Sequence, residues 1–413
     1  MKSVEQYDAV VVGAGPSGCM VSRRIAAEGF SVLLVEEHEQ VGYPSHCAGL
    51  ITPRALNLAE LYPDGLVQNE FRGAIIRSVS GRELSIGGDK THAVAINRPQ
   101  LDAMLAEAAQ ESGAQLLLDT RASHFERSGN GVRIHLDNEH HDWVVETRLL
   151  IGADGARSTV GDWAQLPGPT EVIQAVNALV RLPNSDADFV EIFVGRSVAP
   201  GWFGWLIPLG DGHARLGVGT THGSPRRYLK EMLAAFPQRF RNVEILDTSG
   251  GTIPLGLPRQ IHADNTMLVG DAACQAKHTS GGGVYTGLLG ARSCAQAAVS
   301  AFGDDDLSVE SLGRYYASWG EQMGGELRVG MLLRSIFVRL GDDDFDRLLQ
   351  LLSGQPVKRI ISEHGDIDHP SHLVTRLIPL FPELKTLSSF AALLAHPNEL
   401  VRDVLALLRT SRR

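Results

Sequence analysis

The sequence predicts an α/β protein with a Rossmann-like dinucleotide-binding domain, an inserted antiparallel sheet and a helical C-terminal region. A strand–turn–helix–strand pattern occupies the first 36 residues, alternating strand-like runs occupy residues 172–250, and helical patterns dominate after about residue 307. The chain has 413 residues, more than one hydrophobic core usually covers, so two joined domains are expected.

Buried strands in separate parts of the chain predict a discontinuous first domain. Apolar runs at 7–12, 31–35, 148–153 and 266–270 are typical of parallel strands, and helical spacing is found at 15–28, 99–112 and about 282–301. The expected dinucleotide-binding domain therefore comprises residues 1–75, 96–170 and 251–330. The inserted sheet comprises 76–95 and 171–250, and the helical region comprises 331–413.

Composition excludes several classes of protein. The formal net charge of -10 argues against a nucleic-acid partner. The four cysteines, Cys19, Cys47, Cys274 and Cys294, lack metal-ligand spacing, so neither a metal site nor a disulfide framework is expected. No apolar stretch is long enough to span a membrane and no signal-peptide pattern is present, so a cytoplasmic location is expected.

A glycine-rich turn carries the strongest functional signal. Gly13 allows a tight turn, Gly15 allows the backbone to approach a pyrophosphate, and Gly18 allows close packing of helix on strand. The turn follows a strand, opens a helix, and is followed by an acid, Glu36, which would accept hydrogen bonds from an adenosine ribose. The residues predicted to bind the cofactor here are Gly13, Gly15, Pro16, Ser17, Gly18 and Glu36.

Two later motifs decide which dinucleotide binds. Residues 151–158 (IGADGARS) and 268–273 (LVGDAA) both end buried strands with an aspartate. With the segment 97–102 (NRPQLD), they resemble the flavoprotein superfamily that includes the aromatic hydroxylases. The resemblance implies an FAD-binding domain of that type, in which Asp154 supports the pyrophosphate region, Asp271 holds a ribityl hydroxyl and Arg98 lies near the cofactor.

Three further segments narrow the resemblance. Residues 278–287 (HTSGGGVYTG), 44–49 (PSHCAG) and 201–209 (GWFGWLIPL) are similar to the geranylgeranyl reductase family, flavoenzymes that saturate isoprenoid double bonds. The resemblance covers about residues 5–330. It implies that Cys47 and Ala48 lie at the flavin and that Gly281, Gly282 and Gly283 face its isoalloxazine ring. It also implies that Phe203, Trp205 and Pro208 line the substrate cavity. The family often has Tyr at position 203 and Phe at 207, and these departures bear on the substrate.

The reaction implied by this resemblance is reduction of isolated double bonds in a geranylgeranyl or other isoprenoid chain. A hydride would come from N5 of reduced flavin and a proton from a pocket donor, for which Cys47 is the candidate; its alternative role is only to shape the pocket. Phe203 and Trp205 would stabilise positive charge on the substrate carbon or act as ordinary core aromatics. His278, beside the glycines, is a further pocket candidate.

Two alternatives remain open at this point. The string 203–208 also resembles flavin-dependent halogenases, so a monooxygenase or halogenase is one, although Lys90 does not match the lysine context those enzymes need. The other is an electron-transfer or non-catalytic flavoprotein. No second dinucleotide fingerprint is present, so the electron donor would be transiently bound NAD(P)H or a ferredoxin-like protein. The helical C-terminal region is expected to pack on the protein, the alternative being a peripheral membrane contact of an otherwise cytoplasmic protein that takes a prenyl-lipid substrate.

Overall fold

The apolar strands at the centre of the first domain form a mainly parallel sheet. The computed structural model describes residues 4–61, 64–183 and 187–377, and there the parallel strands have the order β8-β2-β1-β11-β18. β9 and β10 add an antiparallel arm to β11, and β17 pairs with β18. The strands are β1 (Glu5–Val12), β2 (Val32–Val35), β8 (Gln115–Leu117), β9 (Arg121–Ser128), β10 (Gly131–Asp137), β11 (Asp142–Gly152), β17 (His262–Ala263) and β18 (Thr266–Leu268).

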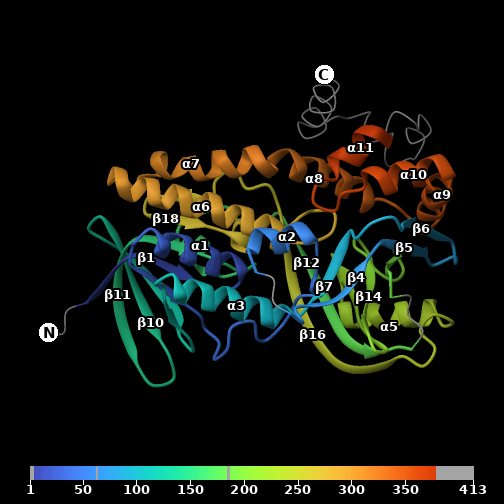
Figure 1. Ribbon diagram of the computed structural model, residues 1–413, viewed down its shortest axis with the longest axis horizontal. Coiled ribbons are helices and arrows are strands. Elements are labelled where there is room, and N and C mark those ends of the chain that lie inside the picture. Colours follow the sequence, from blue (N-terminus) through green and yellow to red (C-terminus); the bar gives the residue numbers. More distant parts are fainter. Residues whose placement is uncertain (1–3, 62–63, 184–186, 378–413) are drawn as a thin grey trace.

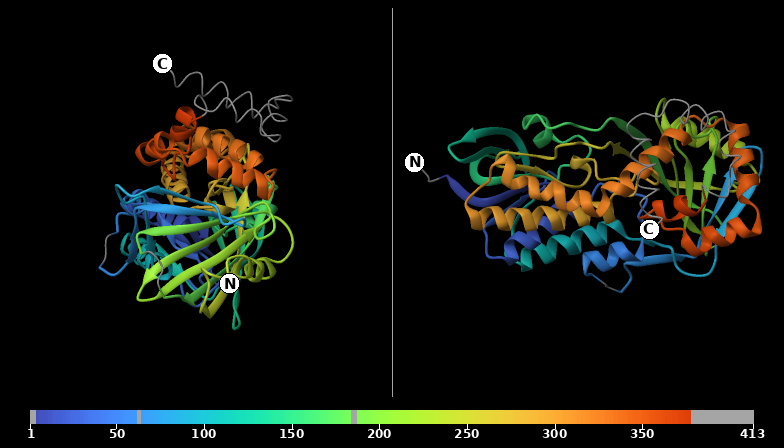
Figure 2. Two further views of the ribbon diagram at one scale, coloured as in Figure 1. Left: turned by 90° about the vertical axis from the view of Figure 1, so that its right-hand side faces the viewer. Right: turned by 90° about the horizontal axis from the view of Figure 1, so that it is seen from above.

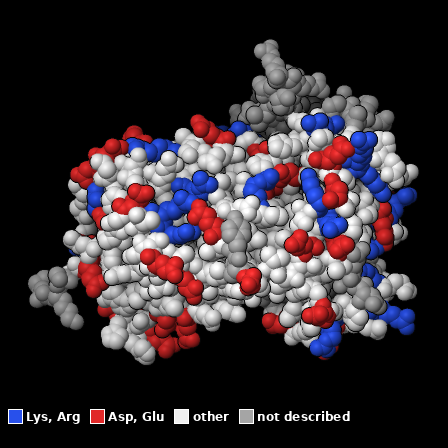
Figure 3. Space-filling model, viewed as in Figure 1, with Lys and Arg blue, Asp and Glu red and all other residues white. Residues whose placement is uncertain are grey.

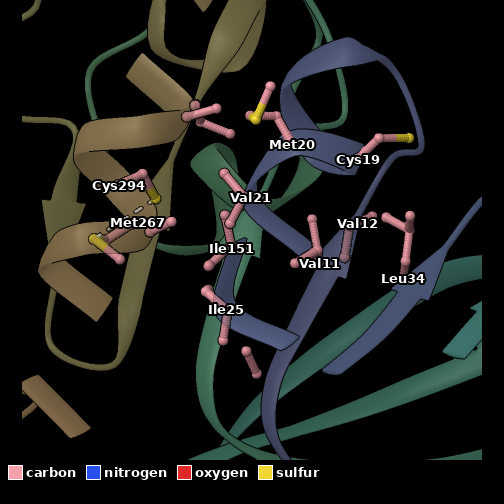
Figure 4. Close-up of a cluster of buried hydrophobic side chains, with 14 of the residues drawn as sticks. Val11, Val12, Cys19, Met20, Val21, Ile25, Leu34, Ile151, Met267 and Cys294 are labelled. Carbon is pink, nitrogen blue, oxygen red and sulfur yellow. Dashed lines mark hydrogen bonds between the residues drawn. The ribbon is translucent and has the colours of Figure 1, made fainter. Parts of the chain in front are cut away.

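A row of packed helices covers this sheet, with α1 in contact with both α3 and α6, and α6 in contact with α7 (Figure 1). Their apolar sides meet the strands in one core, part of which is drawn in Figure 4. Cys19 and Cys294 are fully buried there. The helices are α1 (Pro16–Ala27), α3 (Arg98–Glu111), α4 (Thr159–Trp163), α6 (Val284–Asp304) and α7 (Val309–Trp319).

The second sheet has the order β16-β12-β15-β14-β13-β5-β6. It is antiparallel as predicted, except that β5 pairs in parallel with β13, which comes more than 100 residues later in the chain. A helix that the sequence reading missed, α5 (Pro225–Ala235), covers one face through Leu229 and Met232. The strands are β5 (Gly73–Ser78), β6 (Glu83–Gly87), β12 (Glu171–Arg181), β13 (Phe189–Val194), β14 (Gly204–Gly210), β15 (His213–Thr220) and β16 (Glu244–Leu255).

The two sheets lie side by side along the long axis of the molecule, with the long strands β12 and β16 reaching toward the first sheet (Figures 1 and 2). A small sheet, β3-β7-β4, is formed by chain that leads into α3. The division of the chain into domains by residue number stays a prediction. The elements of this connecting region are β3 (Leu50–Ile51), α2 (Pro53–Ala59), β4 (Val67–Phe71) and β7 (Ala93–Ile96).

The helices after α7 pack on the second sheet. Leu332 and Leu340 are buried, and Phe337 contacts Phe345 at a ring-centroid distance of 5.2 Å. Of the predicted helical region 331–413, residues 378–413 lie outside the described part of the chain. In the described ranges no helix has the length and hydropathy needed to cross a membrane. The helices are α8 (Gly325–Phe337), α9 (Asp342–Leu352), α10 (Gln355–His364) and α11 (Ser371–Leu377).

Charged side chains of both signs are mixed over the face of the molecule drawn in Figure 3. This face offers no continuous basic surface of the kind that tracks a nucleic-acid backbone.

Candidate active site

The three segments expected to share one cofactor lie together in the structure. β1, β11 and β18 are neighbouring parallel strands, so the residues that follow them meet at one edge of the sheet. A Cβ atom on Gly13 would lie 2.4 Å from the carbonyl oxygen of Ala153, and one on Gly270 would lie 2.7 Å from Oγ of Ser17. The glycine turn therefore touches the segments at residues 154 and 271.

The backbone of the glycine turn explains why glycine stands at two of its positions. Gly13 has a φ of 101°, which favours glycine, and a Cβ on Gly18 would lie 1.9 Å from the carbonyl oxygen of Gly13. By contrast, a Cβ built on Gly15 has no atom of the described residues within 4 Å, apart from its own chain neighbours. α1 begins after Gly15 without a side-chain cap, so no capping side chain satisfies the N–H groups of its first turn, which is the arrangement that suits a phosphate group.

Glu36, at the end of β2, is tied to this turn. Its Oε2 accepts a hydrogen bond of 2.8 Å from the backbone N–H of Ala14, and its Oε1 lies 2.5 Å from Nδ1 of His38. Each carboxylate oxygen has a second lone pair, so the side chain can still accept hydrogen bonds from ribose hydroxyls.

The carboxylate of Asp154 has local partners. It accepts hydrogen bonds from the hydroxyls of Ser158 and Thr159 and from the backbone N–H of Val160, so it anchors the start of α4. The part of Asp154 that lies near Gly13 is its backbone nitrogen. The cofactor role predicted for Asp154 stays a prediction.

Asp271 differs from Asp154 in its partners. Its carboxylate accepts no hydrogen bond from the described residues. A Cβ on Gly283 would lie 2.9 Å from its Oδ1, so the carboxylate lies beside the glycine loop. Burial raises the pKa of Asp271 from 3.8 to about 6, against the opposing charge of Arg98. A half-buried acceptor without a donor among the described residues suits a ligand hydroxyl.

Asp271→Asn is expected to stabilise the FAD-free protein at about pH 8 and to leave its stability unchanged at about pH 4. Folding raises the pKa, so this group's contribution is full below about pH 4 and is lost as the pH rises through about 6. Two pKa units correspond to a gain on the order of 2–3 kcal/mol. Urea unfolding of both proteins at the two pH values measures it; a gain equal at both pH values would contradict the expectation.

Cys47 interacts electrostatically with two guanidinium groups, those of Arg98 and Arg215. Arg98 forms a two-point ion pair with Asp102 at 2.9 and 3.0 Å, while Arg215 on β15 donates to the carbonyl oxygen of Ala48 at 3.0 Å and to Gln68 at 2.6 Å. Burial lowers the pKa of Arg98, but the neighbouring Asp102 and Cys47 outweigh it and raise that pKa overall.

The positive charge of Arg215 is less well compensated by neighbouring negative groups than that of Arg98. Burial lowers its pKa, the nearby Cys47 opposes this, and the charge of Arg98 lowers it further. Within the described ranges Arg215 has no carboxylate partner. Both arginines thus interact electrostatically with the same sulfur atom, and the backbone N–H of Gly49 donates to it at 3.3 Å.

The aromatic residues predicted for the substrate cavity, Phe203 and Trp205, contact each other and, with Trp202, form what is called here the aromatic wall. Phe203 stacks on Trp202 with ring centroids 5.0 Å apart and meets Trp205 edge to face at 6.2 Å. These rings share an apolar cluster with Ala48 of the cysteine segment and Ala276 before the glycine loop. Pro208 lies further along β14, where its carbonyl oxygen accepts a hydrogen bond from Asn69.

His278 is buried rather than exposed at the surface of a pocket. Its Nε2 lies 3.0 Å from the carbonyl oxygen of Gly256, and burial lowers its pKa to about 4. Nearby, the guanidinium of Arg334 lies over the ring of Trp202 at 4.6 Å and forms a two-point ion pair with Glu171. Arg334 and Glu171 line a cavity of about 300 Å³ on this side of Trp202.

Comparisons with known proteins identify the family to which a chain with this arrangement belongs. A family model described as an FAD binding domain matches residues 6–297. A digeranylgeranylglycerophospholipid reductase of Methanothrix thermoacetophila is 30% identical over 368 residues, which cover 86% of this chain and 93% of the relative. The chain belongs to the geranylgeranyl reductase family of FAD-dependent oxidoreductases.

Two further proteins align over similar lengths. An uncharacterized protein of Methanocaldococcus jannaschii is 31% identical over 378 residues, covering 90% of this chain and 95% of that protein. The crystal structure of a geranylgeranyl bacteriochlorophyll reductase-like protein from Thermoplasma acidophilum superimposes with a TM-score of 0.83. It is 24% identical and covers 93% of this chain and 100% of that chain. The expected fold class, family and FAD cofactor are therefore confirmed.

This geranylgeranyl reductase family member has site residues that the sequence reading missed. Trp202 lies within the segment 201–209, and Asp102 lies four residues after Arg98, a spacing typical of a helical ion pair. Arg215, Lys277 and Asp368 gave no local signal. Arg215 reaches the cysteine segment from another sheet, and Lys277 and Asp368 form an ion pair across 91 residues.

Proposed function

We propose that the protein is an FAD-dependent reductase that saturates isolated double bonds of a geranylgeranyl or related isoprenoid chain. The supporting observation is the apolar cluster, in which the cysteine segment, the segment before the glycine loop and the aromatic wall meet. Relatives named digeranylgeranylglycerophospholipid reductases support the same substrate class. An apolar chain needs such surroundings, because they contain few polar groups to be left without partners.

In this proposal reduced FAD would supply the hydride, and the residues of the chain bind and orient the cofactor and protonate the substrate. The free N–H groups of α1 and the hydroxyl of Ser17 hold the pyrophosphate, Glu36 holds the ribose, and Asp271 accepts a hydrogen bond from a ribityl hydroxyl. Gly281, Gly282 and Gly283 let the backbone approach the flat ring without Cβ atoms. Electrons arrive from NAD(P)H or a ferredoxin-like protein.

Cys47 donates the proton in this scheme. Once the proton has gone, the negative charge left on sulfur lies beside the guanidinium groups of Arg98 and Arg215 and accepts the N–H of Gly49. Phe203 and Trp205 belong to the cluster, where a ring face turned to the substrate would favour positive charge developing on the substrate carbon by about 0.5–2 kcal/mol.

Anaerobic single turnover tests the proposal. We expect the photoreduced protein, mixed with geranylgeranyl diphosphate or a digeranylgeranyl glycerolipid, to reoxidise its flavin while the product gains pairs of hydrogen atoms by mass spectrometry. Turnover that requires oxygen would instead identify a monooxygenase or halogenase. Flavin that is not reoxidised by any prenyl substrate, but is reoxidised by a protein acceptor, would identify an electron-transfer flavoprotein.

A further inference from the structure

A buried ion pair lies beside the glycine loop. Nζ of Lys277 lies 2.5 Å from Oδ1 of Asp368; the lysine is 7% exposed and the aspartate 0%. Lys277 belongs to the loop itself, because its N–H donates to the carbonyl oxygen of Gly282 and its carbonyl oxygen accepts from Gly281. A Cβ on Gly282 would lie 3.3 Å from Nζ. The cation therefore lies beside the middle glycine of the loop.

The carboxylate that neutralises this cation comes from the C-terminal segment 366–372. The second oxygen of Asp368 accepts hydrogen bonds from the hydroxyl of Thr52 at 2.7 Å and from Arg54 at 3.2 Å. Arg54 also pairs with Asp366 through both terminal nitrogens. Thr52 and Arg54 closely follow the Cys47 segment, so one buried carboxylate joins the segments on two sides of the site.

Further contacts hold the segment in place independently of Lys277. Glu326 of α8 accepts hydrogen bonds from both the backbone N–H and the hydroxyl of Ser371. The ring of His369 meets Tyr285, in the first turn of α6, at a centroid distance of 6.1 Å. The segment can therefore stay docked when the ion pair alone is altered.

We propose that the Lys277–Asp368 pair tunes the reduction potential of the bound FAD, with the C-terminal segment supplying the charge that neutralises Lys277. A flavin gains negative charge on reduction, and an uncompensated cation nearby favours that charge. Asp368 reduces the effect of Lys277 and so keeps the potential lower than the lysine alone would set it. The inference rests on the proposed position of the glycine loop at the flavin ring and is independent of the substrate.

Equilibrium redox titration of the full-length FAD-bound protein, without substrate, tests the inference. We expect Asp368→Asn to raise the ratio of reduced to oxidised flavin about tenfold at a fixed ambient potential, a shift of about 30 mV for a two-electron couple. Lys277→Met removes the cation and should lower the ratio by a similar factor. Lys277→Arg keeps the charge and should stay close to the wild-type value.

Asp366→Asn is the matched control, because it weakens the same segment through Arg54 but leaves Lys277 paired. Its potential should remain close to that of the wild type. Shifts of the same sign in Asp368→Asn and Lys277→Met, or an equal shift in Asp366→Asn, would overturn the inference and assign the segment a purely structural role. If Asp368→Asn does not retain FAD, the two lysine variants decide. The inference then requires a lower ratio of reduced to oxidised flavin in Lys277→Met and a ratio close to the wild-type value in Lys277→Arg. The double-bond chemistry has no part in these outcomes, so the failure of one proposal is distinguishable from the failure of the other.

Discussion

Gly18→Ala is expected to abolish FAD binding and to lower the free energy of unfolding of the FAD-free protein by about 3 kcal/mol. A Cβ at this position would lie 1.9 Å from the backbone carbonyl oxygen of Gly13, which has no flexible end that could move away. Helix α1 would have to shift away from β1, and the glycine turn would shift with it. Flavin absorbance of the purified protein and denaturant unfolding measure the two effects.

Gly15→Ala is expected to weaken FAD binding without changing the stability of the FAD-free protein. Apart from its own chain neighbours, no atom of the described residues lies within 4 Å of a Cβ at Gly15, so the FAD-free protein should keep its stability while FAD affinity falls at least tenfold, about 1.4 kcal/mol. Gly168→Ala, in equally open surroundings remote from the turn, is the control and should change neither quantity. If Gly15→Ala bound FAD as tightly as the wild type, the pyrophosphate would not approach this position.

Cys47→Ala is expected to slow substrate-dependent reoxidation of reduced flavin about 100-fold, the usual contribution of a general acid. The side chain is only partly buried, so its loss leaves no large core cavity, and FAD should be retained. Stopped-flow mixing of the reduced variant with a prenyl substrate measures the effect.

The same preparation supplies the control for Cys47. Flavin reduction by the electron donor requires no proton from a pocket thiol to the substrate, so its rate should match that of the wild type. Reoxidation at the wild-type rate in Cys47→Ala would mean that the proton comes from another group, and Cys47 would then only shape the pocket.

The parts of the fold and site that could be predicted from the sequence depend on local patterns. The turn at Gly13 needs residues without side chains at fixed spacing, and buried parallel strands are continuous apolar runs wherever they occur in the chain. Because such strands meet at one edge, Glu36 and Asp271 could be expected near the turn before the structure was known. Their binding roles remain predictions.

Long-range pairing could not be predicted in this way. The parallel pairing of β5 with β13 leaves no trace in either strand, and α5 was missed within a region dominated by alternating runs. Arg215 has the sequence pattern of an ordinary strand residue, although its guanidinium holds the backbone at Ala48. Asp368 follows a helix in a region with only general helical character, so nothing near it points to Lys277.

The ion pair between Lys277 and Asp368 has a thermodynamic consequence for the segment 366–372. If docking of the segment 366–372 lowers the affinity of the flavin for electrons, then reduction must weaken docking by the same free energy, because coupling between two equilibria is reciprocal. Oxidised protein would hold its C-terminal segment more tightly than reduced protein. Amide hydrogen exchange in residues 366–372 would then report the electron content of the cofactor.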